Sequence, residues 1–282
     1  MKIISLNIRG LGSCCKRTWL KEICKIQSPY MLGIQETKLK EVHNIMVLDF
    51  WGTLDGDFAH IEASGKSGGL LTVWNKNTFK CEFVIKEDNF LAVVGKWDNT
   101  SGLITFYGPN DAKGRKILWS KLDLLCEKEE ISWIFLGDSN EVYGKHERFN
   151  SETNPKGSRD FNDFIQRNGL LDVRMGGNKF TRVSDNGMKF SKLDRFLMTS
   201  GFEKLWRKIG EKVLERKWSD HAPIALYDLG EISVHQLLSS LTPDCIFKDK
   251  LKNVKLAIKA WMKERDGDIE SALKSAKEEV NR

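Results

Sequence analysis

Residues 133–140 read WIFLGDSN, an apolar run that ends in an aspartate, a serine and an asparagine. A short apolar run of this kind is typical of a buried β-strand. Similar runs occur at Met1–Asn7, Tyr30–Gln35, Gly69–Trp74, Phe90–Trp97, Leu103–Tyr107 and Ala222–Tyr227. Between them, apolar residues at helical spacing fall in Lys16–Gln27, Asp111–Lys128 and Ser158–Asn168. Strands that alternate with helices predict an α/β fold.

The composition is that of a globular protein with a small excess of positive charge. Of the 282 residues, 40% are apolar and 30% are charged, and the formal net charge is +6. A basic balance favours polyanionic partners, because each Lys or Arg that contacts a phosphate releases counterions. The six cysteines form no C-x-x-C pair, which indicates reduced thiols. Without a signal peptide or a long apolar run, we expect an intracellular protein with no membrane partner.

Polar side chains recur where the apolar runs end, which is where α/β proteins place their sites. They are Asn7, Glu36, Tyr107, Asp138, Asn140, Asp194, Asp220 and His221. Taken singly, each is more simply explained as a turn, a cap or a packing residue. Their repetition argues for a site, and their chemistry is coherent.

Hard oxygen ligands such as Glu36 and Asp220 suit Mg²⁺, or Mn²⁺, better than zinc. Asp138 could take a proton from water, and Asn140 could orient that water. His221, held by a carboxylate such as Asp194, could donate to a phosphate. Together these groups suit metal-assisted chemistry at a phosphate.

The order of motifs resembles the endonuclease/exonuclease/phosphatase superfamily over residues 1–228. The matching segments are SLNIRGLG, LGIQETK, SGGLLTVW, FYGPN, LGDSN, NKFT, KLDRFL and SDHAPI. The resemblance implies a DNase I-like, four-layered sandwich of two mixed β-sheets flanked by helices. It implies that Glu36 is the main metal ligand, helped by Asn7 and Asp220. It further implies that Asp138 and Asn140 act on the attacking water, that Asp194 and His221 contact the phosphate, and that Tyr107 stabilises the transition state.

Within that superfamily, MKIISLNIRGLG, IQETK and SKLDRFL most resemble the endonuclease domains of plant LINE-type retrotransposons. Residues 229–282, a linker and a helical tail, resemble the segment before a reverse transcriptase. The resemblance implies a nuclear enzyme that nicks DNA and leaves 3′-hydroxyl and 5′-phosphate ends. Arg9, Arg182 and Ser191 stand where enzymes specific for abasic sites carry an aspartate and pocket aromatics, so we expect no abasic preference. The tail's apolar stripe, Phe247 to Trp261, predicts a partner, which is the polymerase region, the nuclease core or a second copy.

Two departures from the family pattern leave alternatives open. Ser139 replaces a packing phenylalanine of the G-D-F-N motif, and Leu6 replaces a tryptophan. Losing a buried aromatic commonly costs about 3–5 kcal/mol unless its space is refilled. One alternative is therefore a catalytically impaired remnant that binds nucleic acid. Another is a phosphatase or phosphodiesterase of the same fold that acts on another phosphoester, since fold does not decide substrate.

Overall fold

The computed structural model describes residues 1–64, 67–97, 100–128, 131–205 and 209–228. The predicted tail at 229–282 lies outside the described residues. Within them, the largest sheet has the strand order β11-β15-β16-β1-β2-β4-β3. The bounds, in that order, are Met175–Gly176, Ile209–Val213, Ile224–Asp228, Lys2–Asn7, Met31–Gln35, Ser67–Asn75 and Gly56–Ser64. It is a mixed sheet, because β1 runs parallel to β2 and antiparallel to β16.

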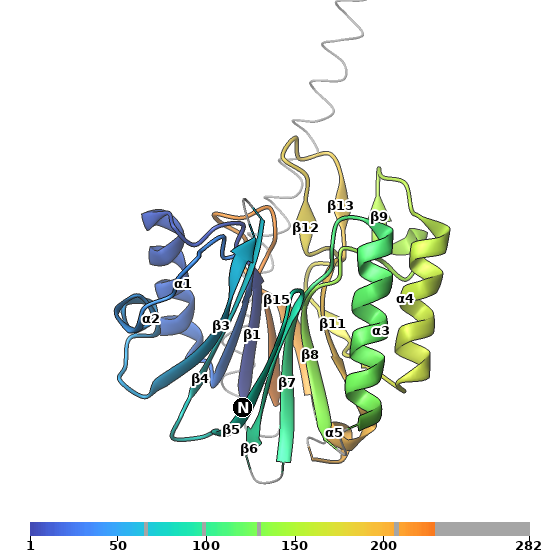
Figure 1. Cartoon of the computed structure of the whole chain (residues 1–282). Helices are drawn as coiled ribbons and strands as arrows, with labels where there is room; N and C mark the ends of the chain where they lie inside the picture. Colours follow the sequence, from blue (N-terminus) through green and yellow to red (C-terminus); the bar gives the residue numbers. More distant parts are fainter. Residues whose placement is uncertain (65–66, 98–99, 129–130, 206–208, 229–282) are drawn as a thin grey trace, which may run out of the picture. The chain divides into compact units, whose positions relative to one another are not determined.

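The second large sheet has the order β10-β14-β8-β7-β6-β5. Its strands are Leu171–Asp172, Asp194–Met198, Ser132–Asp138, Thr100–Tyr107, Phe90–Lys96 and Lys80–Glu87. This sheet is also mixed, since β8 runs parallel to β7 and antiparallel to β14. A small third sheet joins β12 (Arg182–Val183), β13 (Phe190–Ser191) and β9 (Arg148–Phe149). In Figure 1 it projects from one end of the two large sheets.

Helices cover the outer faces of the two large sheets (Figure 1). Helices α1 (Cys14–Gln27) and α2 (Asn44–Trp51) lie against the first sheet, and α3 (Ala112–Lys128) and α4 (Pro155–Arg167) lie against the second. The short elements η1 (Lys145–Glu147) and α5 (Ser200–Leu205) complete the described set. The predicted four-layered sandwich of two mixed sheets flanked by helices is therefore confirmed.

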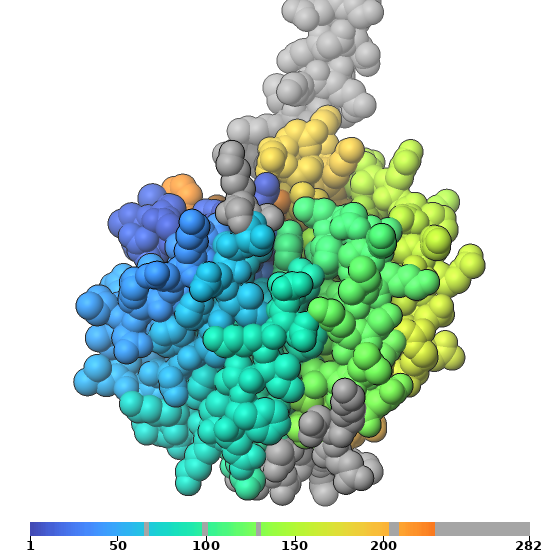
Figure 2. Space-filling view, viewed as in Figure 1, coloured from blue at the N-terminus to red at the C-terminus, as the bar shows by residue number. Residues whose placement is uncertain are grey.

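Strand alternation divides the core into three layers of side chains. Ile3 packs between the two sheets, whereas its neighbour Ile4 packs under α1 and α2. In β8, Ile134 faces the first sheet and Phe135 faces α3 and α4. Successive side chains of a strand point to opposite faces, so a strand that is buried on both faces reads as a continuous apolar run. The space-filling view shows side chains closing the gap between the ribbons (Figure 2).

The sequence predicted the long buried elements but missed several shorter ones. Each of the seven predicted strands and three predicted helices overlaps an observed element, and Gly169 has the left-handed backbone, φ 55°, that ends α4. Missed elements include α2, β3 and β5, of which β3 and β5 lie at sheet edges. Their side chains are largely exposed or half-buried, which weakens the apolar pattern. No helix among the described residues is long and apolar enough to cross a lipid bilayer.

Candidate active site

Strand register brings three of the predicted residues side by side in the second sheet. Tyr107 pairs with Asp138 across the parallel strands β7 and β8. Asp194 pairs with Asp138 across the antiparallel strands β8 and β14. The sequence places these residues far apart, and only strand pairing aligns them in one row.

The first sheet brings Asn7 and Glu36 to the same place. Both follow parallel strands, because Asn7 ends β1 and Glu36 comes directly after β2. The buried amide of Asn7 donates one hydrogen bond to Glu36 Oε1 at 2.9 Å and another to Asp138 Oδ2 at 2.8 Å. Asn7 therefore ties the two sheets together at the centre of the site.

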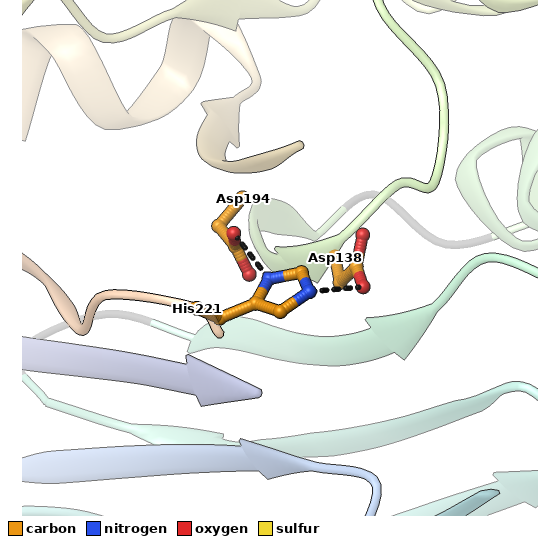
Figure 3. A group of neighbouring side chains, drawn as sticks. All are labelled: Asp138, Asp194 and His221. Atoms are coloured by element: carbon orange, nitrogen blue, oxygen red, sulfur yellow. Dashed lines mark hydrogen bonds and ion pairs between the residues drawn. The ribbon is translucent and has the colours of Figure 1, made fainter. Parts of the chain in front are cut away.

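His221 lies between the carboxylates of Asp194 and Asp138 (Figure 3). Its Nδ1 is 2.7 Å from Asp194 Oδ2, and its Nε2 is 3.7 Å from Asp138 Oδ2. Burial by itself lowers the pKa of this imidazole, but the charges of Asp194 and Asp138 outweigh it and raise the pKa to about 9. Because Asp194 engages Nδ1, the ring presents Nε2 to the side where Asp138 lies.

Asp138 is held on both of its oxygens. Oδ1 accepts the backbone N–H of Asn140 at 2.8 Å, and Oδ2 accepts the amide of Asn7. Burial raises the pKa of Asp138 to about 6; His221 opposes this shift, and Asp194 adds to it. A buried carboxylate with a raised pKa is suited to receiving a proton.

Asn140 and Tyr107 close the other side of the site. The Asn140 side chain donates to the carbonyl oxygen of Gly108 at 2.7 Å, so it fixes the loop after β7. Burial, followed by the charges of Glu36 and Asp138, raises the pKa of Tyr107 above its ordinary range. The phenol therefore keeps its proton and can act as a hydrogen-bond donor.

Asp220 is engaged by two arginines. Its Oδ2 lies 2.9 Å from an Arg9 guanidinium nitrogen and 3.0 Å from Arg182 Nε. Burial alone raises its pKa, but His221, Arg9 and Arg182 outweigh burial and hold the pKa of Asp220 below its usual value. Its other oxygen, Oδ1, is buried and has no hydrogen-bond partner among the described residues.

The oxygen donors fit a hard divalent cation. Glu36 is buried, with its Oε2 3.5 Å from Lys38 Nζ, and the orphaned Asp220 Oδ1 would gain a partner from a cation. Asp138, Asp194 and His221 also place ligand atoms within 4.8 Å of one another. There, however, Asp194 already engages the imidazole Nδ1, so we interpret this group as a hydrogen-bonded relay. Asn7, Glu36 and Asp220 are the better candidates for a metal.

Backbone strain marks the same end of the sheets. Arg9, Glu36 and Asn140 have φ values of 48°, 51° and 48°. Such left-handed conformations of non-glycine residues cost on the order of 1 kcal/mol each and cluster at functional sites. The left-handed conformation at these residues turns the chain sharply after β1, β2 and β8.

Two hydroxyl groups that support the site were not identified from the sequence. Ser219 Oγ donates to the Asn7 carbonyl oxygen at 2.7 Å and accepts the His221 N–H at 3.2 Å. Thr181 Oγ1 accepts the N–H groups of Leu193 and Asp194, each at 3.0 Å. Both residues lie within quoted motifs, NKFT and SDHAPI, so motif position was the one signal that could have identified them.

Ser139 exchanges apolar packing for hydrogen bonds. It is fully buried, and its Oγ lies 2.8 Å from the carbonyl oxygens of Glu141 and Leu193. Its N–H also donates to Leu193 at 2.9 Å. These bonds join the loop after β8 to the start of β14, next to Asp194. Leu6, the other departure, packs into the core under α1 and α2.

The site combines a buried histidine–carboxylate pair with oxygen donors that suit a divalent cation. The chain belongs to the endonuclease/exonuclease/phosphatase family, whose sequence model matches residues 4–221. Members of this family depend on divalent metals, in agreement with the oxygen donors found here.

Nucleases and a 3′ phosphatase are among the solved structures with a similar fold. A 3′ phosphatase from Neisseria, bound to a product DNA hairpin, has a TM-score of 0.65 and 15% identity, covering 81% of this chain and 99% of its own. An AP endonuclease from Leishmania major has a TM-score of 0.62 and 17% identity, covering 80% and 86%. The endonuclease domain of TRAS1, a telomere-specific non-LTR retrotransposon, has a TM-score of 0.60 and 16% identity, covering 80% and 96%. At these identities the likeness establishes the fold alone.

Proposed function

We propose that this protein is a Mg²⁺-dependent endonuclease that nicks DNA and leaves 3′-hydroxyl and 5′-phosphate ends. The observation that carries the proposal is the His221–Asp194 pair, 2.7 Å apart, with His221 Nε2 facing Asp138. This pair lies beside the oxygen donors Glu36 and Asn7. A protonated imidazole next to a proton-accepting carboxylate suits attack by water on a phosphodiester.

Each residue has a defined task in this reaction. His221 Nε2 carries a proton at neutral pH, because its pKa is raised to about 9, and donates a hydrogen bond to a phosphate oxygen. Asp194 holds the ring in place through Nδ1. Asp138, deprotonated above its pKa of about 6, accepts a proton from the water. The Tyr107 hydroxyl donates to charge that develops on the phosphate.

Magnesium is the proposed metal, with Mn²⁺ able to replace it. Asn7, Glu36 and Asp220 would hold it. A cation at this position supplies charge neutralisation at the phosphoryl oxygen and at the departing oxygen.

The test is conversion of supercoiled plasmid to the nicked form in Mg²⁺. Removing His221 should lower the rate by about 10²–10³-fold, as for loss of one transition-state donor. EDTA and Glu36→Ala should abolish nicking. Glu82→Ala is the matched control, because Glu82 is an exposed glutamate on edge strand β5 paired to Lys96. Full activity in EDTA or in Glu36→Ala would overturn the proposal.

The LINE-type origin and the substrate class are further parts of the proposal. They are supported by the motif resemblance, the basic net charge and the resemblance of 229–282 to the segment before a reverse transcriptase. A nuclear location follows for such an enzyme and can be checked by imaging the tagged chain. Truncation after Leu229 should leave nicking within a few-fold of the parent. A soluble, folded truncation without activity would refute the proposed boundary.

We also propose that abasic DNA is not preferred. Arg182, at one of the expected aromatic positions, is bound to Asp220, and Ser191 is buried and pairs with Arg182 across β12 and β13. The comparison is cleavage of an abasic duplex against the intact duplex of the same sequence. A preference of several hundredfold for the abasic strand would contradict this expectation.

A further inference from the structure

A cavity of about 570 Å³ lies beside the metal-ligand candidates. Its walls come from the turns after β1 and β2, the start of α1, the β12–β13 turn and the loop before β16. The lining includes Arg9, Lys16, Arg216, Asp185, Trp218 and Asp220. In Figure 1 the orange loop before β16 lies at the end of the sheets from which β12 and β13 project. The volume suits a ligand of nucleotide size.

Five cationic side chains line the cavity together with the carboxylates of Asp185 and Asp220. Two of the five also pair with carboxylates outside the lining, Lys38 with Glu36 and Lys217 with Glu22, and a positive excess remains. Lys16 is fixed by donating to the carbonyl oxygens of Ile8 and Arg9 at 2.8 and 2.7 Å, and carbonyls carry no net charge. Arg9 is held by Asp220 but remains partly exposed. An excess of anchored cations favours an anionic ligand, and phosphate suits both guanidinium and ammonium groups.

Trp218 gives the cavity an exposed aromatic surface. It is 55% exposed and follows Arg216 and Lys217 in sequence. A single exposed aromatic residue is ordinary on a protein surface. This one, however, lines a cationic cavity that also contains Asp220, next to His221. An aromatic face beside cations is the arrangement on which nucleic-acid bases stack.

We infer that this cavity binds one unpaired nucleotide of DNA next to the cleaved phosphodiester, with its phosphate on Arg9 and Lys16 and its base stacked on Trp218. The base must be unpaired, because both faces of a base within a duplex are covered by its neighbours. The inference deepens the proposed nuclease function and rests on it for the position of the cleaved bond. Duplexes with an unpaired base at the cleavage site are then bound more tightly than fully paired ones.

Asp185 adds a charge test. Its exposed carboxylate lies 3.5 Å from the Arg9 guanidinium, where it competes with a phosphate. Asp185→Asn should therefore tighten binding of DNA containing an unpaired nucleotide by a few-fold, an effect that weakens as salt rises. Unchanged or weaker binding by Asp185→Asn would contradict the assignment of the phosphate to Arg9.

The main experiment measures binding in EDTA, so that it is independent of cleavage. The full chain is titrated by fluorescence anisotropy into a labelled DNA duplex and into the same duplex with one unpaired thymidine. Trp218→Ala should lower affinity for the second duplex by about 5–100-fold, the usual range for losing one stacked base, and should hardly affect the first. Trp218→Phe should retain part of the preference.

Phe83→Ala is the matched control, because Phe83 is a comparably exposed aromatic, 42%, on edge strand β5 outside the cavity. An unchanged preference in Trp218→Ala, or tighter binding of the same bulge made in RNA, would overturn the inference while leaving the nicking proposal intact. Trp218-dependent binding without nicking would instead refute the proposed function alone.

Discussion

Two neighbouring residues of β14, Asp194 and Arg195, belong to two buried charged groups of opposite character. Successive strand residues point to opposite faces, so Asp194 faces His221 and Arg195 faces away. We call Asp138, Asp194 and His221 the catalytic cluster. The arginine cluster consists of Arg195, Glu147, Asp172 and Lys192.

The arginine cluster is a balanced set of ion pairs. Arg195 is fully buried and lies 2.8 Å from Glu147 and 2.9 Å from Asp172, and its guanidinium is 4.7 Å from the centre of the Tyr143 ring. Burial by itself raises the pKa of Glu147, yet Arg195 outweighs burial and lowers that pKa. A carboxylate held so firmly stays ionised and takes no part in proton transfer.

In the catalytic cluster the balance is reversed. Burial raises the pKa of Asp138 to about 6, and the nearby charge of Asp194 overrides part of the help from His221. Asp138 and Glu147 are both buried, so burial alone does not distinguish a structural carboxylate from a functional one. The difference lies in whether the countercharge is complete, which is why perturbed pKa values accompany functional sites.

The largest expected effect comes from removing the centre of the arginine cluster. Arg195→Met leaves buried Glu147 and half-buried Asp172 with Lys192 as the one remaining cation of the cluster, which should lower the free energy of unfolding by about 3–5 kcal/mol. Urea denaturation measures this. Arg174→Met, which removes an exposed arginine, is the control and should have little effect. Equal free energies of unfolding for the two variants would show that the arginine cluster does not stabilise the fold, which would contradict the comparison of the two clusters.

Asp138→Asn should give the opposite result, with activity lost and stability retained. Nicking should fall by at least about 10²-fold, because the proton acceptor is gone. The folded-state pKa of Asp138 lies above its unfolded value, so the wild type loses stability as pH rises towards about 6. The variant lacks that loss, and its stability relative to wild type should therefore increase between about pH 4 and pH 7.

Urea denaturation of wild type and Asp138→Asn at about pH 4 and about pH 7 measures this change in relative stability. Asp163→Asn, at an exposed aspartate, is the control. A relative stability that falls over this range would show that Asp138 is stabilised by its surroundings in the way that Glu147 is.

Glu211, a buried glutamate influenced by the charges of the arginine cluster, tests whether an incomplete countercharge raises a pKa outside the catalytic cluster. Burial raises its pKa to about 8, although Lys192 and Arg195 pull it down. The folded state therefore holds a proton that the unfolded state releases, and stability declines as pH rises from about 4.5 to about 8. Glu211→Gln removes this decline and should stabilise the protein by on the order of 1–3 kcal/mol above that window. Identical stability–pH profiles for variant and wild type would show that Glu211 has a full countercharge.

The smallest effect is expected at Ser139, whose hydroxyl bonds to the carbonyl oxygen of Leu193, directly before Asp194 and Arg195. Ser139→Ala should cost about 1 kcal/mol, the usual contribution of one hydrogen bond. Thermal unfolding measures it, and Ser120→Ala on the exposed face of α3 provides the reference. A loss of several kcal/mol would mean that this bond holds the two clusters in place.

The sequence by itself predicted the α/β class, because strands buried on both faces leave continuous apolar runs such as Trp133–Leu136. The four-layered sandwich was implied by the resemblance to the family. It also predicted the candidate site residues, because Glu36, Asp138 and Asp220 follow or precede those runs in quoted motifs. Short edge strands were missed because their side chains are half exposed and carry little pattern.

Tertiary structure alone decided which charges meet. Arg9 and Arg182 looked in sequence like departures from a pattern, yet both bind Asp220, whose other oxygen has no hydrogen-bond partner within the part of the chain that the structure describes. Asp194 and Arg195 are neighbours in the chain, and only strand alternation sends one to His221 and the other to Glu147. Long-range pairing and desolvation set the pKa of each group, and neither can be read from the order of residues.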